Sequence, residues 1–196
     1  ADANATADDL WSALGKASRQ DVRAVLVSFL DQPGVPLVTV VPLPGGRAKL
    51  TQTRFLNAGA LAPGAQLWRV PVTLRYPKDS GSMTQRVLLT RAEQIVALET
   101  KTTPAWIHPN AGEAGYYRWS VPPSVFARLT ADALGMLDTR ERVGFVGNAS
   151  ALLQAGQLRG DDYVRVLEAF ASDPEPEVVD SVVSGLGTIR ETFFAE

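Results

Sequence analysis

The chain has 196 residues, 45% of them hydrophobic, which is enough to fill a buried core in one or two domains. Acidic and basic residues number 21 and 19, so the chain lacks the basic footprint of a nucleic-acid or membrane-surface binder. The absence of cysteine excludes disulfides, thiolate metal sites and cysteine nucleophiles, and no apolar run reaches the roughly 20 residues that cross a bilayer. We therefore expect a soluble, folded protein of undetermined compartment.

The first zone, residues 1–34, is predicted to be helical. Thr6 followed by Asp9 resembles a capping box, in which a hydroxyl and a carboxylate satisfy free N–H groups at a helix start. A second helix is indicated by apolar residues at helical spacing, which places them on one face: Val22, Val25, Leu26, Phe29 and Leu30. Pro33-Gly34 is expected to end this helix.

The second zone, residues 35–121, loses the helical period and shows short β-branched and aromatic runs between turn signals, as antiparallel strands do. Gly45-Gly46 is a predicted turn, and Pro71 indicates an edge strand or bulge. The clearest alternation puts five residues on one side of a strand: Trp68, Val70, Val72, Leu74 and Tyr76. About seven strands are expected, a number that suits a small β-sandwich, at residues 37–41, 50–56, 68–76, 86–90, 94–99, 105–108 and 116–121.

The third zone, residues 122–196, returns to helical spacing after Pro122-Pro123. A short helix is expected to start at Val125. Thr139 is expected to cap the next helix, which Gly156 ends. Two more helices are expected to start at Asp161 or Asp162 and at Asp173-Pro174, the last with an apolar side made of Val178, Val179, Val182, Val183 and Leu186.

Catalytic chemistry is limited by the single histidine, His108. A His-Glu-x-x-His zinc helix needs two imidazoles one turn apart, so this chain cannot form one. Pro109 biases the backbone of His108 towards extended geometry, which favours a loop or strand-end histidine without a catalytic role. As the base of a Ser-His-Asp arrangement, it lacks a Gly-x-Ser-x-Gly elbow, because the stretch 147–151 fails at the last glycine. We predict no catalytic, metal-binding or substrate-binding residue here.

Two glycine-containing motifs also favour structural interpretations. Gly185-Leu186-Gly187 lies inside a helical pattern with no preceding strand, so it does not predict a dinucleotide site. The second motif, Gly160-Asp161-Asp162, lacks the alternating oxygen ligands of a calcium loop, and a helix N-cap is the favoured interpretation.

Several short motifs follow one another over nearly the whole chain, at residues 9–14, 29–40, 50–56, 67–72, 106–110, 115–118, 140–142, 152–153 and 155–156. Taken in this order, they resemble the segment that follows the active site in the aminopeptidase N family of gluzincin zinc aminopeptidases. Two residues depart from that pattern. Asn148 stands where an acidic residue is expected, and Trp119 replaces the usual aliphatic residue after the arginine.

The resemblance implies an α+β, multidomain fragment of a longer polypeptide. Residues 1–34 would be the terminal helices of a thermolysin-like catalytic domain, residues 35–121 a β-sandwich, and residues 122–196 the start of the C-terminal α-helical domain. The parent protein would be a zinc metallo-aminopeptidase of peptide catabolism. Its zinc ligands and catalytic residues would all lie before this segment, which would itself bind no cofactor.

The resemblance also implies a scaffolding role. The expected partner of this segment is the rest of the parent polypeptide, peptides are the substrates of the parent, and neither nucleic acid nor a membrane is expected. A different class of function stays open, namely a β-sandwich and helical interaction module of a non-catalytic protein or of a relative that has lost catalysis. A hydrolase built around His108 would require that an activity disappear on substitution of that residue.

Overall fold

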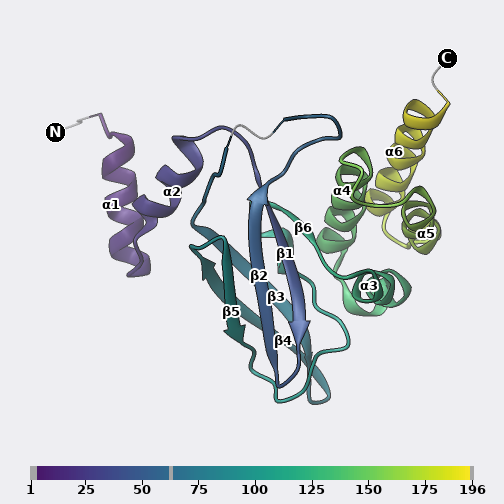
Figure 1. Ribbon diagram of the computed structural model, residues 1–196, viewed down its shortest axis with the longest axis horizontal. Helices are drawn as coiled ribbons and strands as arrows, with labels where there is room; N and C mark the ends of the chain where they lie inside the picture. Colours follow the sequence, from purple (N-terminus) through teal and green to yellow (C-terminus); the bar gives the residue numbers. More distant parts are fainter. Residues whose placement is uncertain (1–3, 62–63, 195–196) are drawn as a thin grey trace.

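The computed structural model describes residues 4–61 and 64–194. The outermost residues of the predicted first and third zones, 1–3 and 195–196, and residues 62–63 lie outside that description. The fold is α+β, with two N-terminal helices, six strands in two sheets and four C-terminal α-helices. Figure 1 shows α1 and α2 on one side of the sheets and α3–α6 on the other. None of the described helices is both long enough and apolar enough to span a membrane.

The N-terminal helices are α1 (Ala7–Ser18) and α2 (Val22–Leu30). The predicted capping box is confirmed, because the Asp9 N–H donates to Thr6 Oγ1 at 3.3 Å and the Thr6 N–H donates to Asp9 Oδ2 at 2.8 Å. Neither helix contains a fully buried residue, and Leu30 is 66% exposed. The apolar residues of α1 are therefore largely exposed, whereas those of α2 other than Leu30 are partly buried.

The first sheet has the order β5-β2-β1-β6. Its strands are β1 (Pro36–Leu43), β2 (Arg47–Arg54), β5 (Glu93–Ala97) and β6 (Arg118–Ser120); β6 alone pairs in parallel, with β1. The second sheet is the antiparallel hairpin of β3 (Val70–Lys78) and β4 (Gly81–Leu89). Gly45 and Gly46 form the predicted turn with positive φ, and a Cβ on Gly46 would lie 1.8 Å from the Thr100 carbonyl oxygen.

The strand count is six, and the predicted strand at residues 105–108 does not form. His108 makes only an isolated bridge with Arg75, and Asn110 makes one with Thr73. Pro109 has no N–H to donate, so a regular ladder cannot continue through it. β4 begins at Gly81, whereas the predicted strand began at residue 86. The prediction missed the first half of the strand because that half is mostly polar and exposed and shows no apolar alternation.

The two sheets and the C-terminal helices share one hydrophobic core. The predicted alternation on β3 is confirmed, since Trp68 is 1% exposed and Val70, Val72, Leu74 and Tyr76 are fully buried. The helices contribute their own aromatic and aliphatic residues, including Phe126, Leu129, Phe145 and Phe170. One continuous core therefore joins the sheets to the helices on their C-terminal side.

The C-terminal helices are α3 (Pro123–Met136), α4 (Thr139–Gln154), α5 (Gly160–Phe170) and α6 (Pro176–Phe193). A short 3₁₀ turn, η1 (Ala111–Glu113), precedes β6. Gly156 ends α4 with a φ of 68°, as predicted.

The predicted helix starts need correction by a few residues. Asp138, not Thr139, is the N-cap of α4, because its carboxylate forms a capping box with Glu141. Arg159 occupies the N-cap position of α5, so Asp161 and Asp162 lie in the first turn and the N-cap interpretation of these aspartates was wrong.

The last helix starts at Pro176, where proline fits the first turn, and Asp173 instead accepts a hydrogen bond from the Glu175 N–H at 3.0 Å. Its predicted apolar side is only partly buried. Val178 and Val182 are buried, whereas Val183 is 62% exposed and Leu186 is 55% exposed.

Candidate functional site: the junction between the sheets and the C-terminal helices

The residues between β3, η1 and the start of α4 form the most polar buried region of the chain. The buried polar side chains His108, Asn110 and Glu141 gather here, together with the ion-paired Arg75. No group of three or more metal-ligating side chains that could hold an ion occurs among residues 4–61 and 64–194. The contacts of these side chains connect the strands to the C-terminal helices.

His108 lies at the centre of this region and is fully buried. Its backbone exchanges two hydrogen bonds with Arg75, at 2.9 and 2.7 Å, which gives the extended geometry predicted for it. Its Nε2 lies 3.7 Å from Glu113 Oε1 and 4.0 Å from Glu141 Oε1, and its ring stands edge-on to Trp119 at 5.3 Å. Neither ring nitrogen has a hydrogen-bond partner among the described residues, so the geometry there gives no Ser-His pair.

Glu141 connects three elements through one fully buried carboxylate. Its Oε2 accepts the Asp138 N–H at 2.9 Å, and its Oε1 accepts the Gly112 N–H at 2.8 Å. The same carboxylate pairs with the Arg75 guanidinium of β3, which also donates to the Met136 carbonyl. A buried charge needs such partners to offset its lost hydration, so β3, η1 and α4 are held in one arrangement.

The loop that carries η1 is shaped by Asn110. Its Oδ1 accepts the Gly115 N–H at 2.8 Å, and its Nδ2 donates to Glu113 Oε2 at 3.1 Å. The Glu113 side chain then packs directly on α4 at Gly144, where an added Cβ would lie 2.1 Å from the carboxyl carbon of Glu113. Any side chain at position 144 would therefore have to displace the Glu113 side chain from α4.

Tyr117 fixes the other end of the same loop. Its hydroxyl donates to the Pro109 carbonyl at 2.7 Å and accepts the Thr73 N–H at 3.3 Å, so it joins the loop to β3. Burial raises the pKa of this hydroxyl well above its ordinary value, because the phenolate would lose its hydration. The hydroxyl therefore acts as a structural donor.

Asn148 of α4 holds the short strand β6. Its Oδ1 accepts the Trp119 N–H at 3.0 Å and its Nδ2 donates to the Trp119 carbonyl at 2.9 Å. The Trp119 ring stacks on Phe145 with centroids 5.4 Å apart and planes inclined by 8°. The two residues that depart from the family pattern are therefore direct partners, and an amide suits this position because it offers both a donor and an acceptor.

Three of the motifs that carried the family resemblance meet at this junction. Residues 106–110 and 115–118 lie close together in sequence, on either side of η1, and residues 140–142 reach the η1 turn from α4 through Glu141. Sequence reasoning missed Arg75, Glu113 and Gly144 because their partners lie on other elements. The Asp-x-x-Glu spacing at Asp138 and Glu141 was a readable capping signal.

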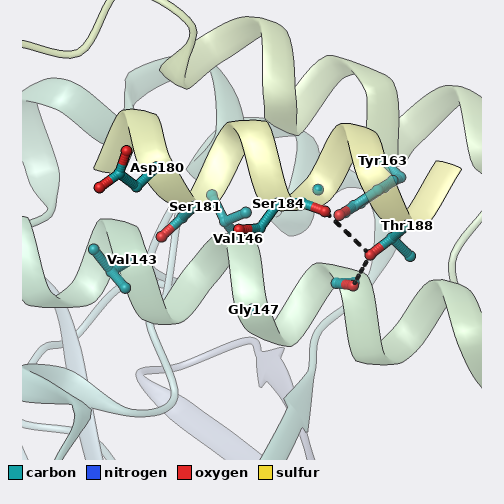
Figure 2. Close-up of a pocket in the computed structure, with 10 residues that line it drawn as sticks. Val143, Val146, Gly147, Tyr163, Asp180, Ser181, Ser184 and Thr188 are labelled. Carbon is teal, nitrogen blue, oxygen red and sulfur yellow. Dashed lines mark hydrogen bonds between the residues drawn. The ribbon is translucent and has the colours of Figure 1, made fainter. Parts of the chain in front are cut away.

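Apart from this junction, a pocket of about 320 Å³ lies between α4 and α6 (Figure 2). It is lined mainly by hydroxyl-bearing and small residues, and the buried Tyr163 hydroxyl has no hydrogen-bond partner there. Thr188 forms only weak contacts with Ser150, at 3.5 Å, and with the Ser184 carbonyl, at 3.4 Å. Asp180 is the ionisable carboxylate of the lining, but it is exposed and forms no hydrogen bond with these hydroxyls among the described residues, so the geometry gives no hydroxyl–base pair.

Comparison with known proteins connects this architecture to a family. Residues 106–196, which contain the η1 loop, β6 and all four C-terminal helices, match the family described as ERAP1-like C-terminal domain. The chain is 27% identical to the puromycin-sensitive aminopeptidase of Caenorhabditis elegans over 190 residues. It is 30% identical to aminopeptidase M1-A of Oryza sativa over 186 residues, and 27% identical to aminopeptidase 2 of Candida albicans over 194.

These alignments cover nearly all of the chain but little of each relative. They include 95%, 92% and 98% of this chain, against 20%, 21% and 21% of the nematode, rice and yeast proteins respectively. The chain thus spans about a fifth of the length of the relatives it matches. Together with the match to the C-terminal domain, they show that the chain belongs to the M1 aminopeptidase family.

Proposed function

We propose that this chain is a non-catalytic connecting segment of a zinc aminopeptidase that removes N-terminal residues from peptides. In this proposal residues 1–34 are terminal helices of the catalytic domain, residues 35–121 are a β-sandwich made of the two sheets, and residues 122–196 start the C-terminal helical domain. The segment would hold the helical domain in a fixed position relative to the catalytic domain. Peptide access to the active site would depend on that position.

The observation that carries the proposal is the buried junction at Glu141. An ion pair with no more than 17% side-chain exposure on either partner joins β3 to α4, and the core continues across it. Independent modules joined by a linker have few such contacts, whereas a rigid connector needs them. The junction therefore supports a role in fixing one domain against another.

The exposed apolar faces at the two ends of the fold support the same role. On α1, Leu10 is 57% exposed and Leu14 is 44% exposed; on α6, Val183 and Leu186 are more than half exposed. Exposed apolar patches on soluble domains commonly mark surfaces that contact another domain or protein. In the proposal these faces contact the rest of the parent polypeptide.

The residues of this chain do not fit a catalytic zinc site. Zinc needs three protein ligands of the histidine, carboxylate or thiolate type with an open position. The chain offers one histidine and no cysteine, and that histidine is fully buried beside a carboxylate already held by Arg75. The zinc of the proposed parent would therefore be held by residues outside positions 1–196.

The alternative function is an interaction module of a non-catalytic protein. The same exposed apolar faces suit it, since they would then contact a separate partner protein. The two hypotheses differ in the polypeptide encoded before Ala1. The connector hypothesis requires a His-Glu-x-x-His zinc helix there, and the alternative requires that it be absent.

The test compares residues 1–196 with the complete gene product. Both are purified, their zinc content is measured by atomic absorption, and hydrolysis of alanyl and leucyl p-nitroanilides is followed. We expect one zinc per molecule and activity in the complete product only, with activity reduced by Glu141→Leu but not by the exposed control Glu93→Leu. A complete product without zinc or activity would support the interaction module instead.

A further inference from the structure

A groove of about 600 Å³ runs over the outer face of the β3–β4 hairpin, beside the start of α2. This face is turned away from the core, because Val70, Val72 and Leu74 point the other way and are fully buried. The groove is lined by hairpin residues and by the residue before β3, namely Arg69, Pro71, Val72, Thr73, Arg86, Val87 and Leu88, of which Val72 and Val87 are buried. At its Thr73 and Ala114 end the groove reaches the η1 loop, but the Glu141 carboxylate does not line it, and the connecting role proposed above does not use the groove.

The charges in this groove are not balanced. The Nε of Arg69 is buried without a hydrogen-bond partner, and no contact of the exposed Arg86 guanidinium with a carboxylate occurs within the described residues. By contrast, Arg75 of β3 is neutralised by Glu141. The one carboxylate at the groove, Asp21, already accepts the Ala24 N–H at 3.0 Å as the cap of α2. Two guanidinium groups therefore face the groove against one engaged carboxylate.

Strand register fixes the spacing of these groups. Arg86 is the cross-strand partner of Thr73, which lies four residues along the chain from Arg69. At about 3.3 Å per residue, the two arginines are separated by about 13 Å along the strand direction. Between them, Pro71 and Leu88 are direct cross-strand partners and are both exposed. The groove thus presents a cation, an apolar pair and a second cation in line.

We propose that this groove binds an extended peptide segment in which two acidic residues flank an apolar one, in the order acidic-x-apolar-x-acidic. Alternate side chains of an extended peptide point the same way, so residues i, i+2 and i+4 would all face the groove. Their spacing matches that of Arg69, the Pro71–Leu88 pair and Arg86. Arginine is well suited to this task because its fork of donors fits a carboxylate.

The experiment measures binding of a fluorescein-labelled, N-acetylated and C-amidated peptide, Ser-Glu-Thr-Leu-Thr-Glu-Ser, to the full chain by fluorescence anisotropy. We expect Arg86→Ala to raise the dissociation constant about fivefold, the scale of an exposed ion pair. Arg69→Ala should raise it more, about tenfold, because that guanidinium is half-buried. Added salt should weaken peptide binding by the unsubstituted chain more than peptide binding by either arginine variant.

Matched controls keep the test decisive. Arg91→Ala removes an exposed arginine outside the groove and should leave binding unchanged. A peptide with glutamine at both acidic positions, and one with the two glutamates adjacent, should each bind at least about fivefold more weakly. Equal binding of all three peptides, or equal losses for Arg91→Ala and Arg86→Ala, would overturn the proposal. So would dimerisation of the chain that Arg86→Ala abolishes, because it would assign the groove to a second copy.

Discussion

The N-terminal and C-terminal helices attach to the sheets in different ways. Helix α4 buries eight residues, two of them charged, and shares the core of both sheets. Helices α1 and α2 bury none fully, and α2 meets the rest of the fold through the partly buried Phe29, which packs on the core, and through Ser28, whose hydroxyl accepts the Arg69 N–H at 3.0 Å. Helical periodicity therefore predicts a helix and its apolar face, but not whether that face finds a partner within the chain.

The largest effect is expected from Glu141→Leu at the α4 junction. The substitution leaves Arg75 without its carboxylate and removes acceptors from two backbone N–H groups, so the free energy of unfolding should fall by about 3–5 kcal/mol. Urea denaturation followed by tryptophan fluorescence measures it. Glu93→Leu, which disrupts only the exposed 3.6 Å pair with Lys49, should change stability by less than about 1 kcal/mol.

A double substitution separates charge burial from packing at this junction. Arg75→Met combined with Glu141→Leu removes both charges together, and it should be less destabilising than Glu141→Leu alone. If the double variant is as unstable as the sum of the two single ones, the ion pair does not couple β3 to α4.

The next effect is expected from Asn148→Ala. The change removes both hydrogen bonds to Trp119 and leaves a buried N–H and carbonyl unpaired, which should cost about 2–3 kcal/mol. The near-ultraviolet circular dichroism of the tryptophans should change as well, since the stack of Trp119 on Phe145 depends on this position. An unchanged unfolding midpoint would show that β6 does not depend on α4.

Two glycines of α4 should respond with opposite signs. Gly144→Ala places a methyl group against Glu113, so we expect a net loss of about 1 kcal/mol after the gain in helix propensity. Gly147→Ala meets no atom within 4 Å and should raise stability by up to about 1 kcal/mol. Thermal unfolding of the two variants side by side tests whether loop contact at Gly144 limits the helix.

The smallest effect is expected at the N-terminal end. The Thr6 backbone N–H, followed by its hydroxyl, lowers the pKa of Asp9 below 3.8. A carboxylate with a lowered pKa in the folded state stabilises α1 above its ordinary pKa, and this contribution is lost as the pH falls through the lowered value. Backbone chemical shifts should therefore report fraying of α1 below about pH 4, with no change in α4; Thr6→Ala should fray already at pH 7.

The sequence predicted the parts of the fold that depend on local rules. The Thr6–Asp9 capping box, the alternation from Trp68 to Tyr76 and the turn at Gly45-Gly46 follow from hydrogen-bonding and burial patterns within a few residues. The sequence did not predict the junction, because Arg75 and Glu141 are 66 residues apart and no local pattern around either residue indicates that the two form an ion pair.

The first half of β4 was missed for a different reason. Its exposed face carries no apolar alternation, and only the register with β3 defines it as a strand.

Native-state hydrogen exchange tests the contrast between the two ends most directly. Amides of β6 and α4 should exchange together and most slowly, through opening of the whole core, while amides of α1 should exchange far faster through local opening. Glu141→Leu should accelerate β6 and α4 by the same factor and leave α1 unchanged. Protection of α1 equal to that of α4, or opening of β6 while α4 stays closed, would contradict a rigid junction between the sheets and the C-terminal helices.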